Sequence, residues 1–275
     1  MKKSILLILI GIFIAACDKE PSKISINDDS AQLFEDGDII ENAVVDYDGN
    51  IYNAVVIGQQ VWMQSNLRTT HYADGTEIPF ETEVSDSIAC YYYVDNGRDI
   101  ADYGYWYNWK ATMRNAPATN ANPSGVQGIC PRGWHIPSNA EWVQLTDYLR
   151  SQSQYFCCSN SNDIAKSLAS ETGWNSYTES GQEFNTFNIR CCVGNPYYTN
   201  NATGFSAFPA GFYGAFYYGC LPSGVGQDAD YWSTTEHPDA SDIVLGCTIM
   251  YNSTSVFCRT LNAKRFGYSV RCVRD

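Results

Sequence analysis

The sequence predicts an α+β fold in which short strands and one or two helices support long, disulfide-stapled loops. Of the 11 cysteines, ten remain once Cys17 is set aside, and an even number in an exported chain indicates disulfides. Residues 151–230 are crowded with Ser, Asn, Gly, Tyr and Cys and offer only brief β-prone runs. A clear helical pattern is confined to residues 139–150 and a shorter stretch before them.

The first 16 residues predict a lipoprotein signal peptide. Lys2 and Lys3 supply positive charge, residues 5–16 are apolar apart from one glycine, and small residues precede Cys17 in a pattern that resembles a lipobox. The apolar run is too short for a comfortable membrane-spanning helix. We expect cleavage before Cys17 and lipidation of Cys17, so that several acyl chains anchor the chain in a membrane.

Residues 17–42 predict a flexible acidic tether, because they are polar and contain few side chains that could form a core. Within it, residues 18–20 (DKE) resemble the signals that export some lipoproteins to the outer leaflet; the alternative is that they are only part of a solvated spacer. We expect an outer-membrane lipoprotein on the cell surface, with the periplasmic face as the alternative. Residues 43–275 are long enough for one domain with its own core.

The first element expected in the domain is a β-hairpin. Two β-prone runs, 44–47 and 51–57, flank Asp48-Gly49-Asn50, and Asp-Gly between such runs is a strong turn signal. Asp46, Asp48 and Asn50 also alternate like the first ligands of a calcium loop. The glycine comes too early for an EF-hand and no glutamate follows at the required position, which favours the turn.

Two helices follow. A short one is expected over residues 107–113, with Trp106, Trp109 and Met113 turned inward. The longer one, over residues 139–150, begins with the capping box Ser138-Asn139-Ala140-Glu141. Its apolar face repeats at helical spacing, which predicts that this face lies in the core; the face comprises Trp142, Leu145 and Leu149. Short strands are then expected near residues 187–189, 205–209, 230–233, 243–250 and 268–273.

Six segments resemble one known family, the Fibrobacter succinogenes major paralogous domain. They are residues 57–67 (IGQQVWMQSNL), 107–109 (YNW), 128–138 (GICPRGWHIPS), 204–211 (GFSAFPAG), 231–235 (YWSTT) and 269–273 (SVRCV). The resemblance covers most of the chain from about residue 46 and implies a C-type-lectin-like fold. It implies a surface domain without an assigned reaction.

The same resemblance implies a disulfide between Cys130 and Cys272, because a late cysteine on the last strand of that fold often ties back to an early element. So long a loop would stabilise by about 4–5 kcal/mol on the chain-entropy model. The adjacent pairs 157–158 and 191–192 are expected to bond elsewhere, or across to one another, because a ring between neighbouring residues is strained. The remaining pairings stay open.

The net charge of −13 restricts the partners. Nucleic-acid binding requires a positive footprint, so no nucleic-acid partner is expected. Docking onto anionic lipid is disfavoured for the same reason, and the membrane contact is expected only through the lipid anchor.

No catalytic set is evident, and the sequence predicts neither an enzyme, nor a metal site, nor a cofactor. His71, His135 and His237 lie far apart, and His135 is expected to pack or hydrogen-bond beside the capping box. Formylglycine-generating oxidases resemble this fold class and use paired cysteines near the C-terminus together with copper. Cys247 and Cys258 could take that role, but ordinary disulfides are favoured because ten cysteines are available.

The remaining signal is a set of loops rich in Tyr, Ser, Gly and Asn, a composition that suits recognition. We expect a non-catalytic surface domain that binds a glycan or protein ligand through these loops. The candidate ligand-binding residues are Tyr197, Tyr198, Tyr213, Tyr217, Tyr218, Tyr231 and Trp232. The alternatives are a structural envelope protein that self-associates, a ligand-binding protein diversified at its loop positions, and the oxidase.

Overall fold

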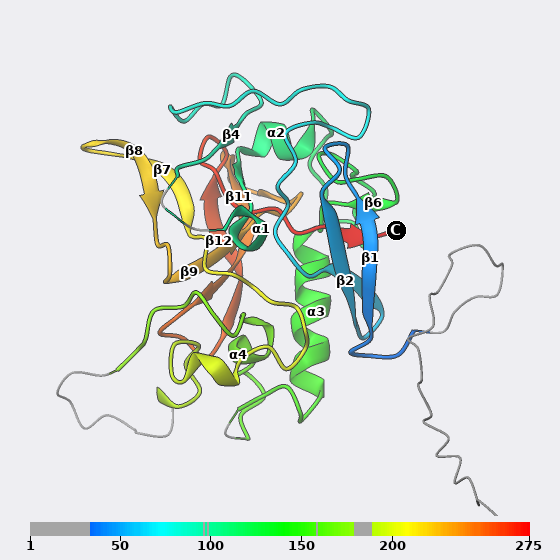
Figure 1. Ribbon diagram of the computed structural model, residues 1–275, viewed down its shortest axis with the longest axis vertical. Helices are drawn as coiled ribbons and strands as arrows, with labels where there is room; N and C mark the ends of the chain where they lie inside the picture. The colour runs from blue at the N-terminus through cyan, green and yellow to red at the C-terminus, as the bar shows by residue number, and fades with distance from the viewer. Residues whose placement is uncertain (1–33, 96, 98, 158, 179–188) are drawn as a thin grey trace, which may run out of the picture. The chain divides into compact units, whose positions relative to one another are not determined.

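Two antiparallel sheets lie on either side of one long helix, α3 (Asn139–Ser151), as Figure 1 shows. The computed structural model describes residues 34–95, 97, 99–157, 159–178 and 189–275. Trp142 of α3 contacts Trp62 of one sheet with ring centroids 4.5 Å apart, and Tyr231 of the other at 5.4 Å. The described chain is therefore a mixed fold that is mostly β-sheet, as the α+β prediction requires.

The first sheet brings the start and the end of the domain together. Its strand order is β1-β2-β3-β13-β6, and all its pairings are antiparallel. Its strands are β1 (Ile39–Val45), β2 (Ile51–Ile57), β3 (Gln60–Met63), β13 (Val273–Arg274) and β6 (Trp134–His135). The predicted hairpin around residues 48–50 is confirmed, since β1 and β2 pair on either side of it.

The second sheet has β11 at its centre, with β10 and β9 on one edge and β12 on the other. Its strands are β9 (Asp228–Tyr231), β10 (Glu236–His237), β11 (Ala240–Met250) and β12 (Val256–Ala263). Two small strand pairs stand apart from it: β4 (Tyr91–Tyr92) with β5 (Trp106–Tyr107), and β7 (Phe212–Phe216) with β8 (Gly219–Ser223). The β7–β8 hairpin projects from the body of the domain (Figure 1).

Helix α3 confirms the strongest local prediction. The Ser138 side chain accepts a hydrogen bond from the Glu141 N–H, and the Glu141 carboxylate accepts one from the Ser138 N–H, which completes the capping box. Trp142, Leu145 and Leu149 are buried. The helix is therefore fixed by its own cap and by an apolar face that both sheets cover.

The remaining helices are short: α1 (Ile100–Tyr103), α2 (Trp109–Met113), α4 (Ala165–Leu168) and the 3₁₀ helix η1 (Tyr197–Thr199). Helix α2 lies where residues 107–113 predict a helix, but it begins two residues later because Asn108 is its N-cap and accepts from the Ala111 N–H. Met113 is buried as predicted. Trp106 is also buried, in strand β5.

Two predicted strands differ from the structure. Residues 205–209 form no strand and make one isolated bridge, between Ala207 and Ala169. Residues 268–273 contribute only the start of β13, with single bridges before it. In both stretches the backbone lies beside buried side chains rather than beside a continuous partner strand. Most of the strand expected at 187–189 lies outside the described residues.

The predicted tether is too long at its C-terminal end. Strand β1 begins at Ile39, the Gly37 N–H donates to the Val56 carbonyl at 2.8 Å, and Asp36 accepts from the Tyr155 hydroxyl at 2.6 Å. The compact unit therefore begins at Phe34 instead of residue 43, because Ile39 and its neighbours pair with β2. The predicted signal peptide (1–16), Cys17 and the rest of the predicted tether lie outside the described residues. Among the described residues, no helix is long and apolar enough to cross a membrane.

The disulfide between Cys130 and Cys272 is present, with Cα atoms 6.1 Å apart, and it ties the residue before β13 to the loop before β6. A second disulfide joins Cys157 to Cys191, so a bond does run across the two adjacent cysteine pairs. The partner position Cys158 lies outside the described residues.

A buried arginine holds several of the family-like segments together. The Arg271 guanidinium donates to Asn66 Oδ1 at 2.8 Å and to the carbonyls of Met63, Phe205 and Ser206 at 2.9, 2.6 and 3.1 Å. It also stacks on the Phe205 ring, 4.5 Å from its centroid. Burial lowers the pKa of Arg271. These contacts show that the segment 269–273 has a structural role: its arginine is the hydrogen-bond hub of the interior.

His135 also has a structural role. Its Nε2 lies 2.7 Å from the Glu141 carboxylate and its Nδ1 lies 2.7 Å from the Asp275 carboxylate. Burial lowers the pKa of His135, but the hydrogen bonds and negative charges of Glu141 and Asp275 outweigh burial and raise that pKa above its usual value. The imidazole thus joins helix α3 to the end of β13, as expected of a packing residue rather than a base.

Candidate functional site

The candidate site begins at the polar turn between β1 and β2. Asn50 donates to Asp46 twice, from its backbone N–H at 2.9 Å and from its side chain at 2.8 Å, and the Tyr52 hydroxyl donates to the same carboxylate at 2.6 Å. Gly49 has a positive φ of 81°, which glycine adopts without strain. Asp46 is therefore committed to the turn, as the turn interpretation requires, and the next acid, Asp48, projects beyond it.

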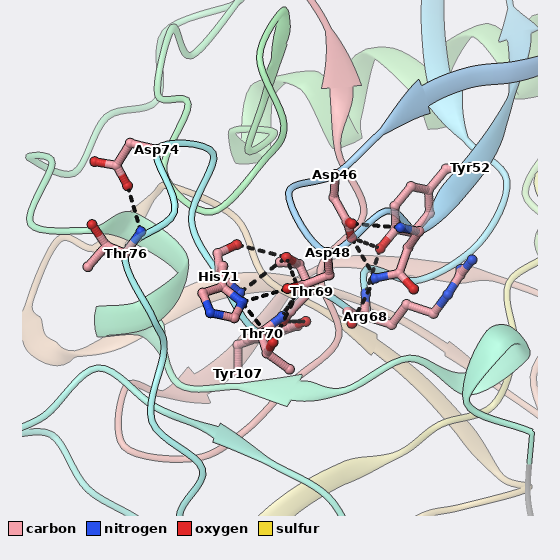
Figure 2. A network of polar contacts seen from close by, with 11 residues as sticks. Asp46, Asp48, Tyr52, Arg68, Thr69, Thr70, His71, Asp74, Thr76 and Tyr107 are labelled. Atoms are coloured by element: carbon pink, nitrogen blue, oxygen red, sulfur yellow. Dashed lines mark hydrogen bonds and ion pairs between the residues drawn. The ribbon is translucent and has the colours of Figure 1, made fainter.

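Asp48 is the centre of a network that reaches the facing loop (Figure 2). Its carboxylate accepts from the Thr70 N–H at 2.5 Å and lies 2.8 Å from the Thr69 hydroxyl and 2.5 Å from His71 Nδ1. Partial burial raises the pKa of Asp48, but the hydrogen bonds from Thr70, Thr69 and His71 together lower it below its ordinary value. Asp48 is thus a stable carboxylate held at the surface.

This network orients His71. His71 Nδ1 faces the Asp48 carboxylate, which fixes the orientation of the ring. The hydroxyls of Thr69 and Thr70 both lie against Asp48, and the Thr70 hydroxyl also lies 3.0 Å from His71 Nδ1. The network can therefore bind and orient a polar group.

Tyr47 covers one side of the network. Its exposed ring contacts the His71 ring with centroids 5.4 Å apart. The ring also lies directly over Gly75, where an added Cβ would come within 2.6 Å of it. Gly75 therefore allows the tyrosine to lie flat against the loop, with the rest of its surface toward solvent.

A separate row of aromatic rings lies close enough to Asp48 for its charge to act on Tyr91. Ring centroids are 5.6 Å apart between Phe80 and Tyr91, 4.7 Å between Tyr91 and Tyr105, and 5.7 Å between Tyr105 and Tyr93. Phe80 and Tyr93 are exposed and the other two are partly exposed. Tyr92, between two members of the row, points to the opposite face, as alternation along a strand requires, and is buried.

The hydroxyl groups distinguish this row from the tyrosines of the interior. Interior hydroxyls donate to the protein: Tyr72 to the Ala111 carbonyl at 3.1 Å and Tyr107 to the Thr69 carbonyl at 2.7 Å. Within the described part of the chain, none of the hydroxyls of Tyr91, Tyr93 and Tyr105 makes a hydrogen bond. They are free to bind a ligand.

Negative charge lies close to the row. Burial raises the pKa of Tyr91, and the carboxylates of Asp48 and Glu77 raise it further. Burial likewise raises the pKa of Tyr105, with contributions from Tyr91, Tyr93 and Asp48. The phenols therefore stay protonated and remain donors at neutral pH, beside carboxylates that accept.

We call this region the aromatic–acid surface; it comprises Tyr47, Asp48, His71, Glu77, Phe80, Tyr91, Tyr93 and Tyr105. It offers ring faces, free hydroxyls and carboxylates. In the described residues, no group of three or more His, Cys, Asp or Glu side chains could hold a metal ion.

Three of the seven predicted ligand-binding residues are in the interior, and for these the prediction is wrong. Tyr213, Tyr231 and Trp232 are only 4, 0 and 1% exposed. Tyr213 stacks on Tyr92 with centroids 4.7 Å apart, and the Trp232 indole N–H donates to the Tyr107 carbonyl at 2.7 Å. Their side chains are part of the core and cannot contact a ligand.

The other four predicted residues lie at the surface in two places. Tyr217 and Tyr218 are 95 and 90% exposed at the tip of the β7–β8 hairpin. Tyr198 is exposed and Tyr197 partly buried, both in η1. In the part of the chain that the structure describes, none of the four belongs to a hydrogen-bond network like that around Asp48, so they remain predicted contacts without a built site.

The aromatic–acid surface was missed because its rings come from separate segments. The signal that could have found it is the density of tyrosine in residues 91–93 (YYY) and 103–107 (YGYWY). Only the pairing of β4 with β5 brings these two runs together. The loop position of Phe80 gives no signal of its own.

A cavity of about 550 Å³ lies elsewhere, bordered by Met113, Arg114 and residues 116–128. Its polar groups are engaged within the protein: Arg114 forms an ion pair with Asp74 at 2.5 Å, and the Ser124 hydroxyl donates to the Ile136 carbonyl. We therefore favour the aromatic–acid surface, where the hydroxyls of Tyr91, Tyr93 and Tyr105 make no hydrogen bond within the described residues.

The predicted oxidase pair, Cys247 and Cys258, lies in the second sheet, away from these rings. The two sulfur atoms are 3.3 Å apart, and no disulfide is formed between them.

Comparison with known proteins identifies a family. The family model described as Fibrobacter succinogenes major domain matches residues 55–274, which is most of the chain. No curated protein and no solved structure matched. The match includes the buried hub around Arg271, the disulfide between Cys130 and Cys272, and most of the aromatic–acid surface. On this evidence, the chain belongs to the Fibrobacter succinogenes major domain family.

Proposed function

We propose that this chain is a non-catalytic recognition protein that binds a glycan on its aromatic–acid surface. The observation that carries the proposal is the linked row of Phe80, Tyr91, Tyr105 and Tyr93, with its unbonded hydroxyls beside the Asp48–His71 pair. Stacking on ring faces and hydrogen bonds to hydroxyl groups are complementary to the two surfaces of a sugar ring.

The charge of the site favours a neutral glycan. Asp48 and Glu77 accept hydrogen bonds from hydroxyl groups but repel carboxylates and phosphates. The nearby guanidinium of Arg68 already donates to the Ile51 carbonyl at 3.0 Å and stacks on Tyr52. With no free cation at the rings in the described structure and a net charge of −13, acidic sugars and nucleic acids are poor candidates.

The absence of a covalent step rests on the hydrogen bonds of the network. A general base acts on a nucleophile within hydrogen-bond reach. The Thr69 hydroxyl instead lies against Asp48, and Nδ1, the His71 nitrogen within reach of the Thr70 hydroxyl, is engaged by the Asp48 carboxylate. We therefore propose that Asp48 orients His71 for binding, with no turnover.

We further propose a C-type-lectin-like fold and a surface location. The support for the fold is the pairing of early strands with the last strand and the disulfide from Cys272 back to Cys130. The support for the location is the sequence of the first 17 residues, which predicts lipidation of Cys17 in the outer membrane. Labelling with a radioactive fatty acid, lost in Cys17→Ala, and protease digestion of intact cells test the anchor and the leaflet separately.

The experiment for the function is a glycan array with soluble protein lacking residues 1–17. Glycans that bind the wild type should lose signal with Tyr93→Ala and Phe80→Ala. Tyr217→Ala is the control, because it removes an even more exposed ring, at the tip of the β7–β8 hairpin and outside the row. Consistent failure to bind any glycan, or loss of binding in the control alone, would contradict the proposal.

A structural envelope protein is the second candidate, and one observation favours it. Strand β1 is an edge of its sheet, and Ile39, Val45 and Ile51 on β1 and β2 are exposed. Unpaired edges with apolar side chains can associate with another copy. Sedimentation at rising concentration distinguishes this candidate, since it predicts ordered oligomers and no glycan binding.

A further inference from the structure

Two cysteines of the second sheet face one another across neighbouring strands. Strands β11 and β12 pair with Thr248 opposite Phe257 and Ile249 opposite Val256. Continuing this register by one residue places Cys247 opposite Cys258. Beyond them the register shifts, with Gly246 opposite Thr260, so a β-bulge directly follows the cysteine pair.

The side chains meet on the same face of the sheet. The two sulfur atoms are 3.3 Å apart. Cys247 is buried in the core around Trp142, whereas Cys258 is partly exposed and its sulfur lies 3.8 Å from the Trp142 carbonyl. A disulfide needs Cβ atoms about 3.8 Å apart and little backbone movement, and directly opposed residues of an antiparallel pair have Cβ atoms about 4.5–5.5 Å apart. A small movement at the bulge is enough to join them.

We propose that Cys247 and Cys258 are an oxidation site of this domain and form a disulfide with each other, in addition to the two among the described residues, which fastens β11 to β12 beside helix α3. The proposal is independent of the ligand-binding function. It concerns the second sheet, while the proposed glycan site lies on the rings beside the first.

The unequal exposure of the two thiols sets the order of the steps. Cys258 meets solvent, so its thiolate attacks an external disulfide, such as that of a thiol oxidoreductase or of oxidised glutathione. A Cys258 mixed disulfide forms and one external thiolate leaves. The Cys247 sulfur then attacks the Cys258 sulfur and the second external thiolate leaves. The two thiol protons pass to the two leaving groups, so the protein loses two hydrogen atoms and the external disulfide becomes two thiols.

The first test is disulfide mapping of the full-length chain, purified from membranes and incubated with oxidised glutathione. The protein is denatured, alkylated without reduction and digested. We expect one linked peptide pair containing Cys247 and Cys258, with neither residue alkylated. Cys90 is an internal control: it is a buried thiol whose sulfur lies near the Tyr92 hydroxyl and the Asn108 amide, and it should be alkylated. Alkylation of Cys247 and Cys258 to the same extent as Cys90 would overturn the proposal.

Two variants test the order of the steps. Cys247→Ser leaves the accessible thiol without its resolving partner, so a mixed disulfide with glutathione should accumulate on Cys258. Cys258→Ser leaves only the buried thiol, which should gain no glutathione in the folded protein. Equal modification of both variants, or modification of Cys258→Ser alone, contradicts this order. The mapping of the unaltered chain does not depend on how well either variant folds.

Discussion

The interior and the aromatic–acid surface of this domain use the same residue types in opposite ways. The hydroxyl of interior Tyr107 donates to a carbonyl, whereas those of Tyr91, Tyr93 and Tyr105 at the surface have no partner in the described residues. The family-like segments converge on the interior, where Arg271 joins them. Family membership therefore indicates the scaffold of the domain, whereas the ligand-binding surface has to be identified from the positions of its side chains.

Two aspartates make the same contrast in electrostatic terms. Asp230 is buried with a single strong hydrogen bond, from the Thr248 hydroxyl at 2.6 Å, and burial raises its pKa to about 7. Asp48 at the surface is only partly buried, and its several hydrogen bonds lower its pKa. An interior carboxyl is therefore neutral over much of the acidic range, whereas the surface carboxylate is charged and available.

The largest effect is expected from removing the hub. Arg271→Ala should lower the free energy of unfolding by about 4 kcal/mol, because several buried carbonyls lose their donor and a cavity opens. Arg271→Lys is the matched variant: it keeps the charge but not the planar fork, so its loss should be smaller. Urea denaturation measures both. Near-wild-type stability of Arg271→Ala would break the assignment of a structural role to this segment.

The next effect concerns His135 and pH. The folded-state pKa of His135 is raised, so its stabilisation is fully present below about pH 6.5 and is lost as pH rises through the folded-state value. His135→Ala should cost about 3 kcal/mol at pH 6, since it leaves Glu141 buried without its partner. Above pH 8 the difference between the variant and the wild type should shrink. Urea denaturation measures the difference in free energy of unfolding between the variant and the wild type. If that difference did not change with pH, it would contradict a raised pKa for His135.

A smaller effect is expected at Asp230, where the substitution should raise the free energy of unfolding instead of lowering it. Because burial raises the pKa of this carboxyl to about 7, folding binds a proton and stability falls as pH rises from about 4 to 7. Asp230→Asn keeps an acceptor for Thr248 and cannot ionise. It should stabilise the protein by on the order of 2 kcal/mol at pH 8 and by little at pH 4. Thermal melting across this range checks the sign, and destabilisation at pH 8 would count against it.

The smallest effects on stability are expected on the surface. Phe80→Ala should change the free energy of unfolding by about 0.5 kcal/mol or less. It should weaken binding to an array-selected glycan about tenfold, which corresponds to one aromatic contact of about 1.4 kcal/mol. Calorimetric titration beside denaturation separates the two quantities. Equal losses of stability and binding would mean that the ring belongs to the scaffold.

Local features of the fold could be predicted from sequence. The Asp-Gly turn and the capping box before α3 depend on neighbouring residues, so each was found at its place. The bond between Cys130 and Cys272 followed from the family resemblance. The start of the domain was placed too late because β1 is recognisable only through its partner β2, whose pairing with Ile39 is not a local signal.

The site was harder to predict because tyrosine is amphipathic. Composition marks loops rich in tyrosine but not the direction of each ring, so Tyr231 and Trp232 were expected at the surface and lie in the core. Tyr91 and Tyr93 reach the surface only because β4 pairs with β5, which buries Tyr92 between them. Long-range packing of this kind decides which aromatic residues a ligand can reach.

Hydroxyl-radical footprinting with and without a bound glycan tests the central claim most directly. It measures the exposure of every aromatic ring in one experiment on the unaltered protein. We predict that the glycan protects Phe80, Tyr91, Tyr93 and Tyr105 and leaves Tyr217 as reactive as before. Protection of the β7–β8 hairpin with none on the row would show that the ligand binds elsewhere and would contradict the account.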